Sequence, residues 1–487
     1  MAALFDRTSC SVCGRQTKSL SYNINITASI ELVRSMDFIM RKLFGTDGIR
    51  ARAGEFPLDE KTVRIIGYSL ARRFAEKLGR APRFITGRDT RESGDWIEKA
   101  IQSGAVAAGS DIESTSIMTT PGVAYLTGKF GFDAGIVISA SHNPFVDNGI
   151  KVFLPDGKKL DDVTEQLIES DIFGDSTAAD FVEVQPKVQR ADEFHEGYLA
   201  HLRGNFPNLR LDGRKMVIDC ANGASCRIAK ALFSTLGAET EVINDSPDGR
   251  NINKDCGSLH LEGLQELVVA SDADLGVAYD GDADRALFVD EKGNVVDGDA
   301  TLWVLARRLN DEGRLTRSQV VATVMSNIGL EIALRSRNIG LIRTQVGDKY
   351  VLDELLKTGA AIGGEQSGHI IFPHESLVGD GMMTTLFLLD ALTAKQRRLS
   401  EAVEGFIRYP QVLVNVRVRE KRPFESVEPI VAAVREVERK LEGTGRLLLR
   451  YSGTENLARV MIEGRDQTEI EREAAYLADV IKSEIGR

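Results

Sequence analysis

The stretch Gly135–Phe153, GIVISASHNPFVDNGIKVF, constrains the fold of this chain most. Residues 135–138 form an uninterrupted apolar run, which is typical of a strand covered on both faces inside a parallel sheet. The run ends in small polar residues, and open α/β sheets bind ligands beyond the carboxyl ends of their strands. Ser141 and His142 are therefore predicted to lie at a binding site.

A lysine follows on the next predicted strand. Asp147–Gly149 has the composition of a turn, and residues 150–153 read as a strand in which Lys151 points away from its apolar neighbours. A simple turn at Ser141 is the alternative interpretation. A hydrolase nucleophile is disfavoured, because the glycines of a nucleophile elbow are missing around Ser141.

The segment DGDADR places three carboxylates at every second position between two apolar strands. In an extended loop Asp280, Asp282 and Asp284 share one side, and three oxygen donors suit a hard cation such as Mg²⁺. A calcium hand is the competitor, because Glu291 falls at its twelfth position. It is disfavoured because Arg285 occupies the sixth position, where the bend requires glycine. A solvated acidic turn stays open as the alternative.

Two further polar loops follow apolar strands. FGTDGIR ends at Arg50, which is either a surface arginine or a phosphate ligand. AIGGEQSGH presents Glu365 and Ser367 after two glycines, where they offer acceptors and a donor to ligand hydroxyls, or else form a polar hairpin.

The last strand, GRLLLR, leads into a glycine turn. The guanidinium of Arg450, the hydroxyls of Ser452 and Thr454, and the backbone amides around Gly453 form a plausible nest for a phosphate. A glycine turn of this kind is a weak signal when it stands alone.

Taken together, these five motifs resemble, in order, those of the α-D-phosphohexomutases, and most closely the phosphoglucosamine mutases of bacteria. The resemblance covers residues 40–487. It implies that Ser141 carries a phosphoryl group and that this phosphoserine and the three aspartates hold one Mg²⁺. It also implies that Arg50 and Arg285 stabilise the transferring charge. Lys151 matches the active-site lysine of the family, and His142 is the second candidate for general acid/base work.

The resemblance also assigns the substrate contacts. Glu365 and Ser367 match the sugar-hydroxyl ligands of the family, and residues 450–454 match its phosphate-binding loop. Gln366 lies where glucose and mannose phosphate mutases tend to carry methionine, and its amide can both accept from and donate to a polar sugar group. We interpret His369 as structural, and we expect Ala283, in place of a more common glycine, to matter little if its backbone angles are ordinary.

The predicted fold class is α/β, with three related α/β domains and a smaller C-terminal α+β domain around a central active-site cleft. This architecture follows from the alternation of strands and helices and from the resemblance. The predicted divisions are an N-terminal extension over 1–39, which is disordered or reflects a misassigned start, a phosphoserine domain over 40–188, a metal-loop domain over 189–298, a sugar-loop domain over 299–400 and a phosphate-loop domain over 401–487.

Charge and composition exclude several classes of protein. A net charge of −11 and a pI near 5.3 argue against nucleic-acid and membrane-surface partners, which require a basic face. The sequence contains no apolar run of the length that a membrane span needs. Five cysteines in 487 residues make no disulfide framework, which predicts the reducing cytoplasm.

The resemblance therefore predicts an isomerase that interconverts glucosamine 6-phosphate and glucosamine 1-phosphate through phosphoserine and a bisphosphate intermediate. Its product would feed UDP-N-acetylglucosamine and cell-wall synthesis, its partner would be the hexosamine phosphate, and a homodimer is the expected assembly. The alternatives are a phosphomannomutase or phosphoglucomutase, or a sugar-phosphate sensor without catalysis. A sensor is disfavoured, since binding alone requires no metal beside a nucleophile.

Overall fold

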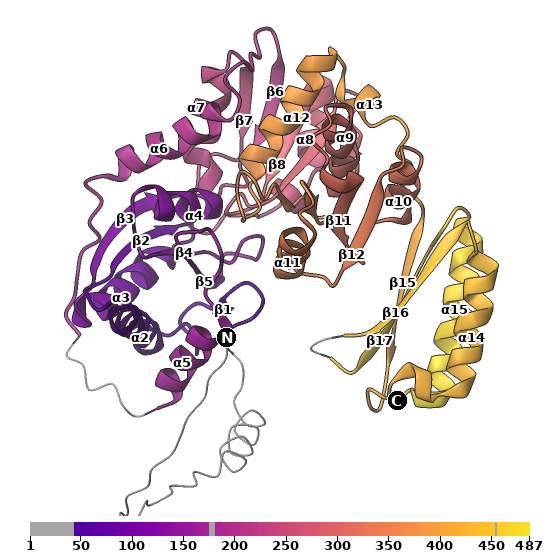
Figure 1. Cartoon of the computed structure of the whole chain (residues 1–487), viewed down its shortest axis with the longest axis horizontal. Coiled ribbons are helices and arrows are strands. Elements are labelled where there is room, and N and C mark those ends of the chain that lie inside the picture. Colours follow the sequence, from indigo (N-terminus) through magenta and orange to yellow (C-terminus); the bar gives the residue numbers. More distant parts are fainter. Residues whose placement is uncertain (1–42, 175–180, 453–454) are drawn as a thin grey trace, which may run out of the picture. The chain divides into compact units, whose positions relative to one another are not determined.

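The described residues form three mixed sheets of similar connectivity and one antiparallel sheet (Figure 1). The computed structural model describes residues 43–174, 181–452 and 455–487. The predicted extension over 1–39 lies outside the described residues, and so do Gly453 and Thr454. None of the helices within the described ranges combines the length and apolar character that crossing a bilayer requires.

The first sheet holds the predicted serine strand at its centre. Its strands are β1 (Ile49–Arg52), β2 (Arg83–Arg88), β3 (Asp111–Ile117), β4 (Ala134–Ile138) and β5 (Asp147–Phe153), in the order β1-β5-β4-β2-β3. Its helices are α2 (Glu60–Leu78), α3 (Gly94–Ala107), α4 (Thr120–Lys129) and α5 (Asp162–Phe173). Every residue of β4 is buried, as predicted. The sheet is mixed, however, because β4 pairs parallel with β2 but antiparallel with β5.

The strand that carries Lys151 begins earlier than the sequence suggests. Asp147–Gly149, which we expected to be a turn, already pairs with β1, with Arg52 opposite Asp147 and Arg50 opposite Gly149. Backbone pairing with a neighbouring strand thus overrides the turn propensity of these residues.

The second sheet repeats the order of four strands of the first, but its antiparallel edge strand follows those four strands in the chain, whereas β1 precedes them. Its strands are β6 (Lys215–Asp219), β7 (Glu239–Ile243), β8 (Leu275–Tyr279), β9 (Ala286–Asp290) and β10 (Val295–Val296), in the order β10-β9-β8-β6-β7. Its helices are α7 (Ala229–Thr235) and α8 (Glu262–Ala270), with short 3-10 turns over Ala224–Arg227 and Gly257–Leu259. Helix α6 (Ala191–Gly204) precedes β6 in the chain and packs against β3 and α4 of the first sheet.

The third sheet is a shorter version of the same plan. Its strands are β11 (Gln319–Thr323), β12 (Gly340–Thr344), β13 (Gly363–Gly364) and β14 (Ile370–Ile371), in the order β12-β11-β13-β14. Its helices are α9 (Gly298–Asp311), α10 (Ile328–Arg335), α11 (Asp348–Thr358), α12 (Gly381–Lys395) and α13 (Leu399–Ala402), with a 3-10 turn over Thr316–Ser318.

The three mixed sheets place their polar loops at the same topological point. In each sheet three parallel strands are followed by one antiparallel strand, and a loop joins the last parallel strand to it. The β4–β5 loop carries Ser141, the β8–β9 loop carries the three aspartates, and the β13–β14 loop carries Glu365 and Ser367. These loops follow carboxyl ends of parallel strands, which is where α/β sheets bind ligands.

The C-terminal segment is a separate α+β layer pair. Strands β15 (Gln411–Arg417), β16 (Gly445–Tyr451) and β17 (Leu457–Gly464) form an antiparallel sheet in the order β15-β17-β16. Helices α14 (Glu428–Leu441) and α15 (Gln467–Ile485) cover one face of it, and a 3-10 turn spans Phe424–Ser426 (Figure 1). This layer pair has its own apolar core, which includes Ile430, Val460 and Leu477.

The three mixed sheets share a continuous apolar core. One cluster of buried side chains joins Val137 of the first sheet, Met216 of the second, and Trp303 and Met382 of the third. The first sheet has a second apolar cluster on its other side, which includes Val63 and Leu70 of α2. Local signals set the ends of that helix: Asp59 caps its amino end by accepting from the Thr62 amide, and a left-handed glycine ends it. The apolar core therefore ties together the sheets that carry the three polar loops.

Candidate active site

Ser141 lies in a strained and buried position beyond β4. Its φ of 52° is in the left-handed region, which is uncommon for a residue other than glycine, and it is only 1% exposed. Its backbone amide donates to the Ser139 hydroxyl at 2.9 Å. A strained residue of this kind persists only where its surroundings determine its conformation.

Two buried side chains from different sheets hold the Ser141 loop. Arg91 Nη2 donates to the carbonyls of Ser141 (3.1 Å) and Asn143 (2.5 Å). Asn253 Nδ2 donates to the same two carbonyls, at 2.9 and 3.2 Å. Arg91 is itself paired with the buried carboxylate of Asp89. The loop is thus clamped from the first sheet and from the second.

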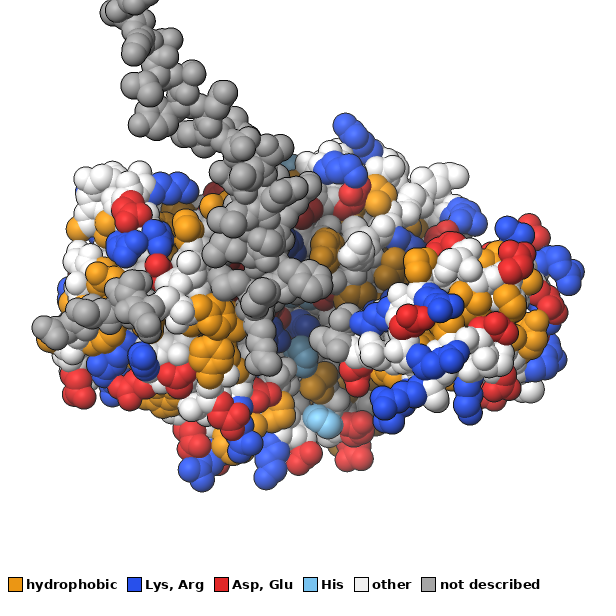
Figure 2. Space-filling model, turned by 90° about the horizontal axis from the view of Figure 1, so that it is seen from below, with side chains coloured by type: hydrophobic (Ala, Val, Ile, Leu, Met, Phe, Trp, Pro, Cys, Tyr) orange, Lys and Arg blue, Asp and Glu red, His pale blue; other side chains and the backbone are white. Residues whose placement is uncertain are grey.

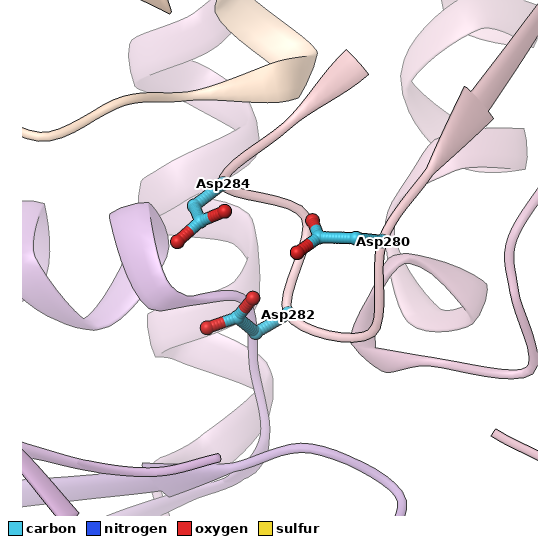
Figure 3. Close-up of side chains that lie close together, drawn as sticks. All are labelled: Asp280, Asp282 and Asp284. Carbon is cyan, nitrogen blue, oxygen red and sulfur yellow. The ribbon is translucent and has the colours of Figure 1, made fainter. Parts of the chain in front are cut away.

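The three aspartates of the β8–β9 loop point toward one another (Figure 3). All three are buried, and one carboxylate oxygen from each lies within 4.8 Å of those of the other two. Burial, followed by repulsion from Asp284 and Asp282, raises the pKa of Asp280 well above its ordinary value.

Two oxygens of this cluster accept no hydrogen bond from the described residues. They are the buried Oδ1 atoms of Asp282 and Asp284, and Asp284 Oδ1 has only the longer ion pairs with Arg285 and His369. Buried carboxylate oxygens that lack a hydrogen bond are costly, and a divalent cation would satisfy them. The aspartates therefore fit a single Mg²⁺.

The serine and the lysine both reach this cluster. The Ser141 hydroxyl donates to Asp280 Oδ2. Lys151 Nζ lies 2.9 Å from Asp282 Oδ2, 3.3 Å from Asp284 Oδ2 and 3.0 Å from Asp47 Oδ2. Burial alone would lower the pKa of Lys151, but these carboxylates hold it well above its ordinary value. The structure brings the predicted nucleophile, lysine and metal ligands into one cluster.

The remaining predicted catalytic residues lie around the same cluster. His142 Nδ1 is 3.3 Å from the Ser141 hydroxyl. Burial, with the charges of Arg285 and Arg50, lowers the pKa of His142 to about 4, so the ring is neutral at pH 7. Arg285 lies beside the metal loop, with Nε 3.8 Å from Asp284 Oδ1, and Arg50 pairs with Asp47.

A cavity of about 370 Å³ opens beside this cluster. Its walls come from four segments of the chain: the FGTDGIR motif, Asp284 and Arg285 of the metal loop, Val346–Asp348, and the sugar loop. A volume of this size is in the range that small-molecule ligands occupy. Three of the five motifs, FGTDGIR, the metal loop and the sugar loop, therefore line one cavity, and the Ser141 loop contacts the metal loop beside it.

Several residues of the site were not predicted from the sequence to belong to it. His369, which we interpreted as structural, lines the cavity, with Nδ1 3.6 Å from Asp284 Oδ1. Lys159 bridges Asp47 (2.6 Å) and Asp348 (2.5 Å) and so joins the first motif to the TQVGDKYV segment. The signal for His369 and Asp47 was present, because His369 lies in AIGGEQSGH and Asp47 lies in FGTDGIR.

The sugar loop presents one of its side chains to the cavity. Glu365 lines it, accepts from the Gly347 amide at 3.1 Å, and lies 3.4 Å from the hydroxyl of Ser367. Gln366 turns away: its amide donates to Asp297 Oδ2, at the start of α9, at 3.4 Å. Gln366 therefore shapes the loop in this structure and makes no direct contribution to the cavity wall.

The phosphate loop is described only at its edges. Arg450, the penultimate residue of β16, lies directly opposite Arg459 of β17, and burial together with the charge of Arg459 lowers the pKa of Arg450. Ser452 is buried, and its carbonyl accepts from Lys421 Nζ at 2.7 Å. Gly453 and Thr454 lie outside the described residues, and none of the described residues of this loop lines the cavity.

Ala283 corrects one expectation. Its φ is 57°, in the left-handed region, and not in the ordinary range on which the expectation was conditioned. The bend that brings Asp282 and Asp284 together requires this conformation, which favours glycine over alanine by reason of the Cβ atom. Alanine at position 283, where glycine is more common, therefore adds local backbone strain to the metal loop.

Comparison with known proteins identifies the family of this chain over most of its length. Models of phosphoglucomutase/phosphomannomutase match it over residues 41–179 (alpha/beta/alpha domain I), 196–293 (domain II), 297–409 (domain III) and 413–480 (C-terminal domain). The chain belongs to the phosphoglucomutase/phosphomannomutase family. This membership confirms the predicted phosphohexomutase, which is an isomerase, and the four models confirm the predicted fold class.

Curated relatives are nearly half identical to this chain over more than nine-tenths of its length. A phosphoglucosamine mutase of Solibacter usitatus is 48% identical over 447 residues, covering 92% of this chain and 99% of the relative. A phosphoglucosamine mutase of Koribacter versatilis is 45% identical over 459 residues, covering 93% and 99%.

Solved structures share the fold of this family. A phosphoglucomutase/phosphomannomutase family protein of Burkholderia thailandensis has a TM-score of 0.73 at 24% identity, covering 92% of this chain and 98% of the other. An N-acetylphosphoglucosamine mutase of Aspergillus fumigatus, in complex with GlcNAc-6P and magnesium, has a TM-score of 0.61 at 19% identity, covering 91% and 96%. The predicted Mg²⁺ is consistent with the buried aspartates of this chain.

Proposed function

We propose that the protein interconverts glucosamine 6-phosphate and glucosamine 1-phosphate. The observation that carries this proposal is the buried hydrogen bond from Ser141 to Asp280 of the metal loop. Lys151 contacts the same loop through Asp282, and the adjacent cavity is lined in part by the sugar loop. The curated phosphoglucosamine mutases, similar over almost their whole length, support the amino sugar as the substrate.

Ser141 is the proposed phosphoryl carrier. Its Oγ gives up a phosphoryl group to one hydroxyl of the sugar phosphate, which forms a bisphosphate, and then takes back the other phosphate. Phosphoryl transfer depends mainly on positioning and on neutralising charge. The clamp of Arg91 and Asn253 supplies positioning for Ser141, and Arg50 and Arg285 supply positive charge.

Asp280, Asp282 and Asp284, with the Ser141 oxygen, are the proposed ligands of Mg²⁺. When bound, the metal supplies charge neutralisation on the phosphoryl oxygens. Lys151 already contacts Asp282 and Asp284, so it lies within reach of the transferred group.

Proton transfer to and from the sugar hydroxyl requires a group beside Ser141. Lys151 and His142 are the two described groups that we propose for it, with Lys151 first, because it is a buried cation in direct contact with Asp282. His142, as a neutral ring 3.3 Å from the serine hydroxyl, is placed to hold that hydroxyl by a hydrogen bond.

The substrate contacts complete the proposal. Glu365 at the cavity wall, with Ser367 beside it, would hold sugar hydroxyls. Arg450, Ser452, Gly453 and Thr454 would hold the phosphate that is not reacting, at the end of the substrate remote from Ser141. The division of the chain at 188, 298 and 400, the homodimer and the cytoplasmic location stay predictions.

A phosphomannomutase or phosphoglucomutase is the second candidate, because the family models and the Burkholderia structure carry those names. The two candidates differ only in the sugar. A sensor without catalysis is disfavoured, because it would need neither a buried serine nor three metal-binding carboxylates.

Specificity constants separate the candidates. We expect the phosphorylated enzyme with Mg²⁺ to prefer glucosamine 6-phosphate over glucose 6-phosphate on the order of a hundredfold, as expected of a site that hydrogen-bonds a substrate group. The measurement is kcat/KM for glucosamine, glucose and mannose 6-phosphates with one enzyme preparation. Equal or higher kcat/KM for glucose or mannose 6-phosphate would assign the enzyme to the second candidate.

A further inference from the structure

A second cavity, of about 100 Å³, lies near the carboxyl ends of α9 and α12. We call it the basic cavity, because five of its lining residues are cations and one, Asp311, is a carboxylate. The cations are Arg307, Arg308, Arg337, Lys395 and Arg397. This balance is unusual for a chain of net charge −11. On the face seen in Figure 2, by contrast, acidic and basic side chains are intermixed over the described surface.

Carboxylates of the protein balance only part of this charge. Arg308 pairs with Glu312 at 2.5 Å and with Asp390 at 3.4 Å, and Lys395 lies 3.7 Å from Asp311. Arg307, Arg337 and Arg397 form no ion pair with a carboxylate in the part of the chain that the structure describes. Three guanidinium groups, with Arg307 half-buried and Arg337 and Arg397 exposed, therefore line the basic cavity without an ion-paired carboxylate among the described residues.

One of these arginines is held in place. The Arg307 guanidinium lies 5.0 Å from the ring centroid of Trp303 and donates to the carbonyls of Ala402 (2.5 Å) and Glu404 (3.3 Å). Burial, followed by the charges of Arg397 and Arg337, lowers its pKa. The three guanidinium groups are thus close enough to repel one another, and an anion between them would relieve that repulsion.

Helix dipoles do not account for the whole cluster. A cation in the last turn of a helix interacts favourably with the helix dipole, and Arg308 in α9 and Lys395 in α12 are placed for this. Arg337 and Arg397 come after the ends of α10 and α12, beyond those last turns.

The chemistry of the lining selects a class of ligand. Planar guanidinium groups match the oxygens of phosphate by paired, charge-assisted hydrogen bonds. A volume near 100 Å³ is well below that of a site for a drug-sized molecule, so it suits one compact anion.

We propose that the basic cavity binds a phosphate group, either inorganic phosphate or the phosphate of a larger molecule whose remainder stays in solvent. The site is separate from the substrate cleft. Helix α9 contacts the sugar loop at its amino end, where the Gly298 amide donates to the Gln366 carbonyl at 2.9 Å, and it reaches the basic cavity near its other end. A helix of 14 residues spans about 20 Å.

Trp303 provides a reporter, because it lies under Arg307 and is one of only two tryptophans. In a Trp96→Phe background Trp303 is the sole tryptophan. We expect inorganic phosphate, titrated at constant ionic strength with chloride as the balancing anion, to change its fluorescence saturably. Glycerol 3-phosphate in a second titration distinguishes the two sources: saturation by the ester as well shows that an attached phosphate group is accepted.

Paired substitutions test the assignment. Arg337→Gln with Arg397→Gln should weaken phosphate binding on the order of tenfold or more, through lost charge-assisted hydrogen bonds. Arg335→Gln with Arg398→Gln removes the same charge from neighbouring positions that do not line the basic cavity, and it should leave binding within about twofold. Should the first pair lose its cooperative thermal transition, Arg397→Gln alone gives the same test.

Two results would overturn the proposal. The first is the absence of a saturable Trp303 response to either phosphate compound. The second is an equal loss of affinity in both pairs of substitutions, since this would mean that only the general charge of the surface attracts the anion.

Discussion

Removal of the Asn253 amide tests how the nucleophile is positioned. Asn253 belongs to the second-sheet segment but donates to the carbonyls of Ser141 and Asn143 in the loop of the first sheet. Its own φ is 57°, so alanine would add backbone strain. Asn253→Gly removes the two hydrogen bonds without this strain, since glycine adopts positive φ freely.

The expected loss of stability is small. Each neutral hydrogen bond contributes about 1 kcal/mol, so the two bonds contribute about 2 kcal/mol. The two carbonyls still accept from Arg91, which spares them the larger cost of a buried carbonyl without a partner. The enzyme should therefore stay folded, with a looser Ser141 loop.

The expected loss of turnover is larger. A displacement of about 1 Å in a reacting group costs up to about a hundredfold in rate. We expect kcat to fall between about tenfold and a hundredfold, and KM to change by less than about twofold, because Asn253 does not line the substrate cavity.

Steady-state kinetics and thermal unfolding of the Asn253→Gly enzyme provide the test. Asn251→Gly is the matched control, because Asn251 lies in the same segment and bonds to Ser246 and Asp248 within it. Parental kcat in both variants, or an equal loss of kcat in the control and in Asn253→Gly, would show that Asn253 does not position Ser141.

Two other substitutions address the buried carboxylates. Burial, followed by repulsion from Asp297, raises the pKa of Asp299 to about 7. Between about pH 4 and pH 7 the unfolded chain has lost this proton and the folded protein has kept it, so the free energy of unfolding falls as the pH rises through this range. Asp299→Asn should raise the thermal midpoint at pH 8.5, by the equivalent of up to about 4 kcal/mol, and leave it unchanged near pH 4. An equal shift at both pH values would mean that the ionisation of Asp299 is not the cause. Asp282→Asn should weaken Mg²⁺ binding in calorimetry on the order of tenfold or more and reduce turnover with it, whereas Glu291→Gln, outside the cluster, should leave both intact. Unchanged Mg²⁺ affinity in Asp282→Asn would mean that the loop is only an acidic turn.

Local sequence was sufficient to locate the strands that carry the site. The apolar runs before Ser141 and Asp280 fold as fully buried strands, and the period-two spacing of the aspartates does place their carboxylates together. These features depend on side-chain alternation and burial, which a single stretch of sequence records.

Contacts between distant segments could not be read in the same way. Asn253 reaches the Ser141 loop across 112 positions of sequence, and Thr120 donates to Asp282 across 162. Nothing in the residues around Asn253 distinguishes a clamp from an ordinary loop amide. Backbone conformation was equally hidden, since the left-handed φ of Ala283 arises from the closure of the metal loop and not from the residue type.

Intact-protein mass spectrometry with peptide mapping tests whether Ser141 carries the phosphoryl group. After incubation with glucosamine 1,6-bisphosphate and Mg²⁺, we expect a mass increase of one phosphoryl group, located on Ser141 and removed by excess glucosamine 6-phosphate. Ser141→Ala should show neither the added mass nor measurable turnover. A phosphoryl group on a different residue, or near-parental turnover in Ser141→Ala, would show that Ser141 is not the phosphoryl carrier.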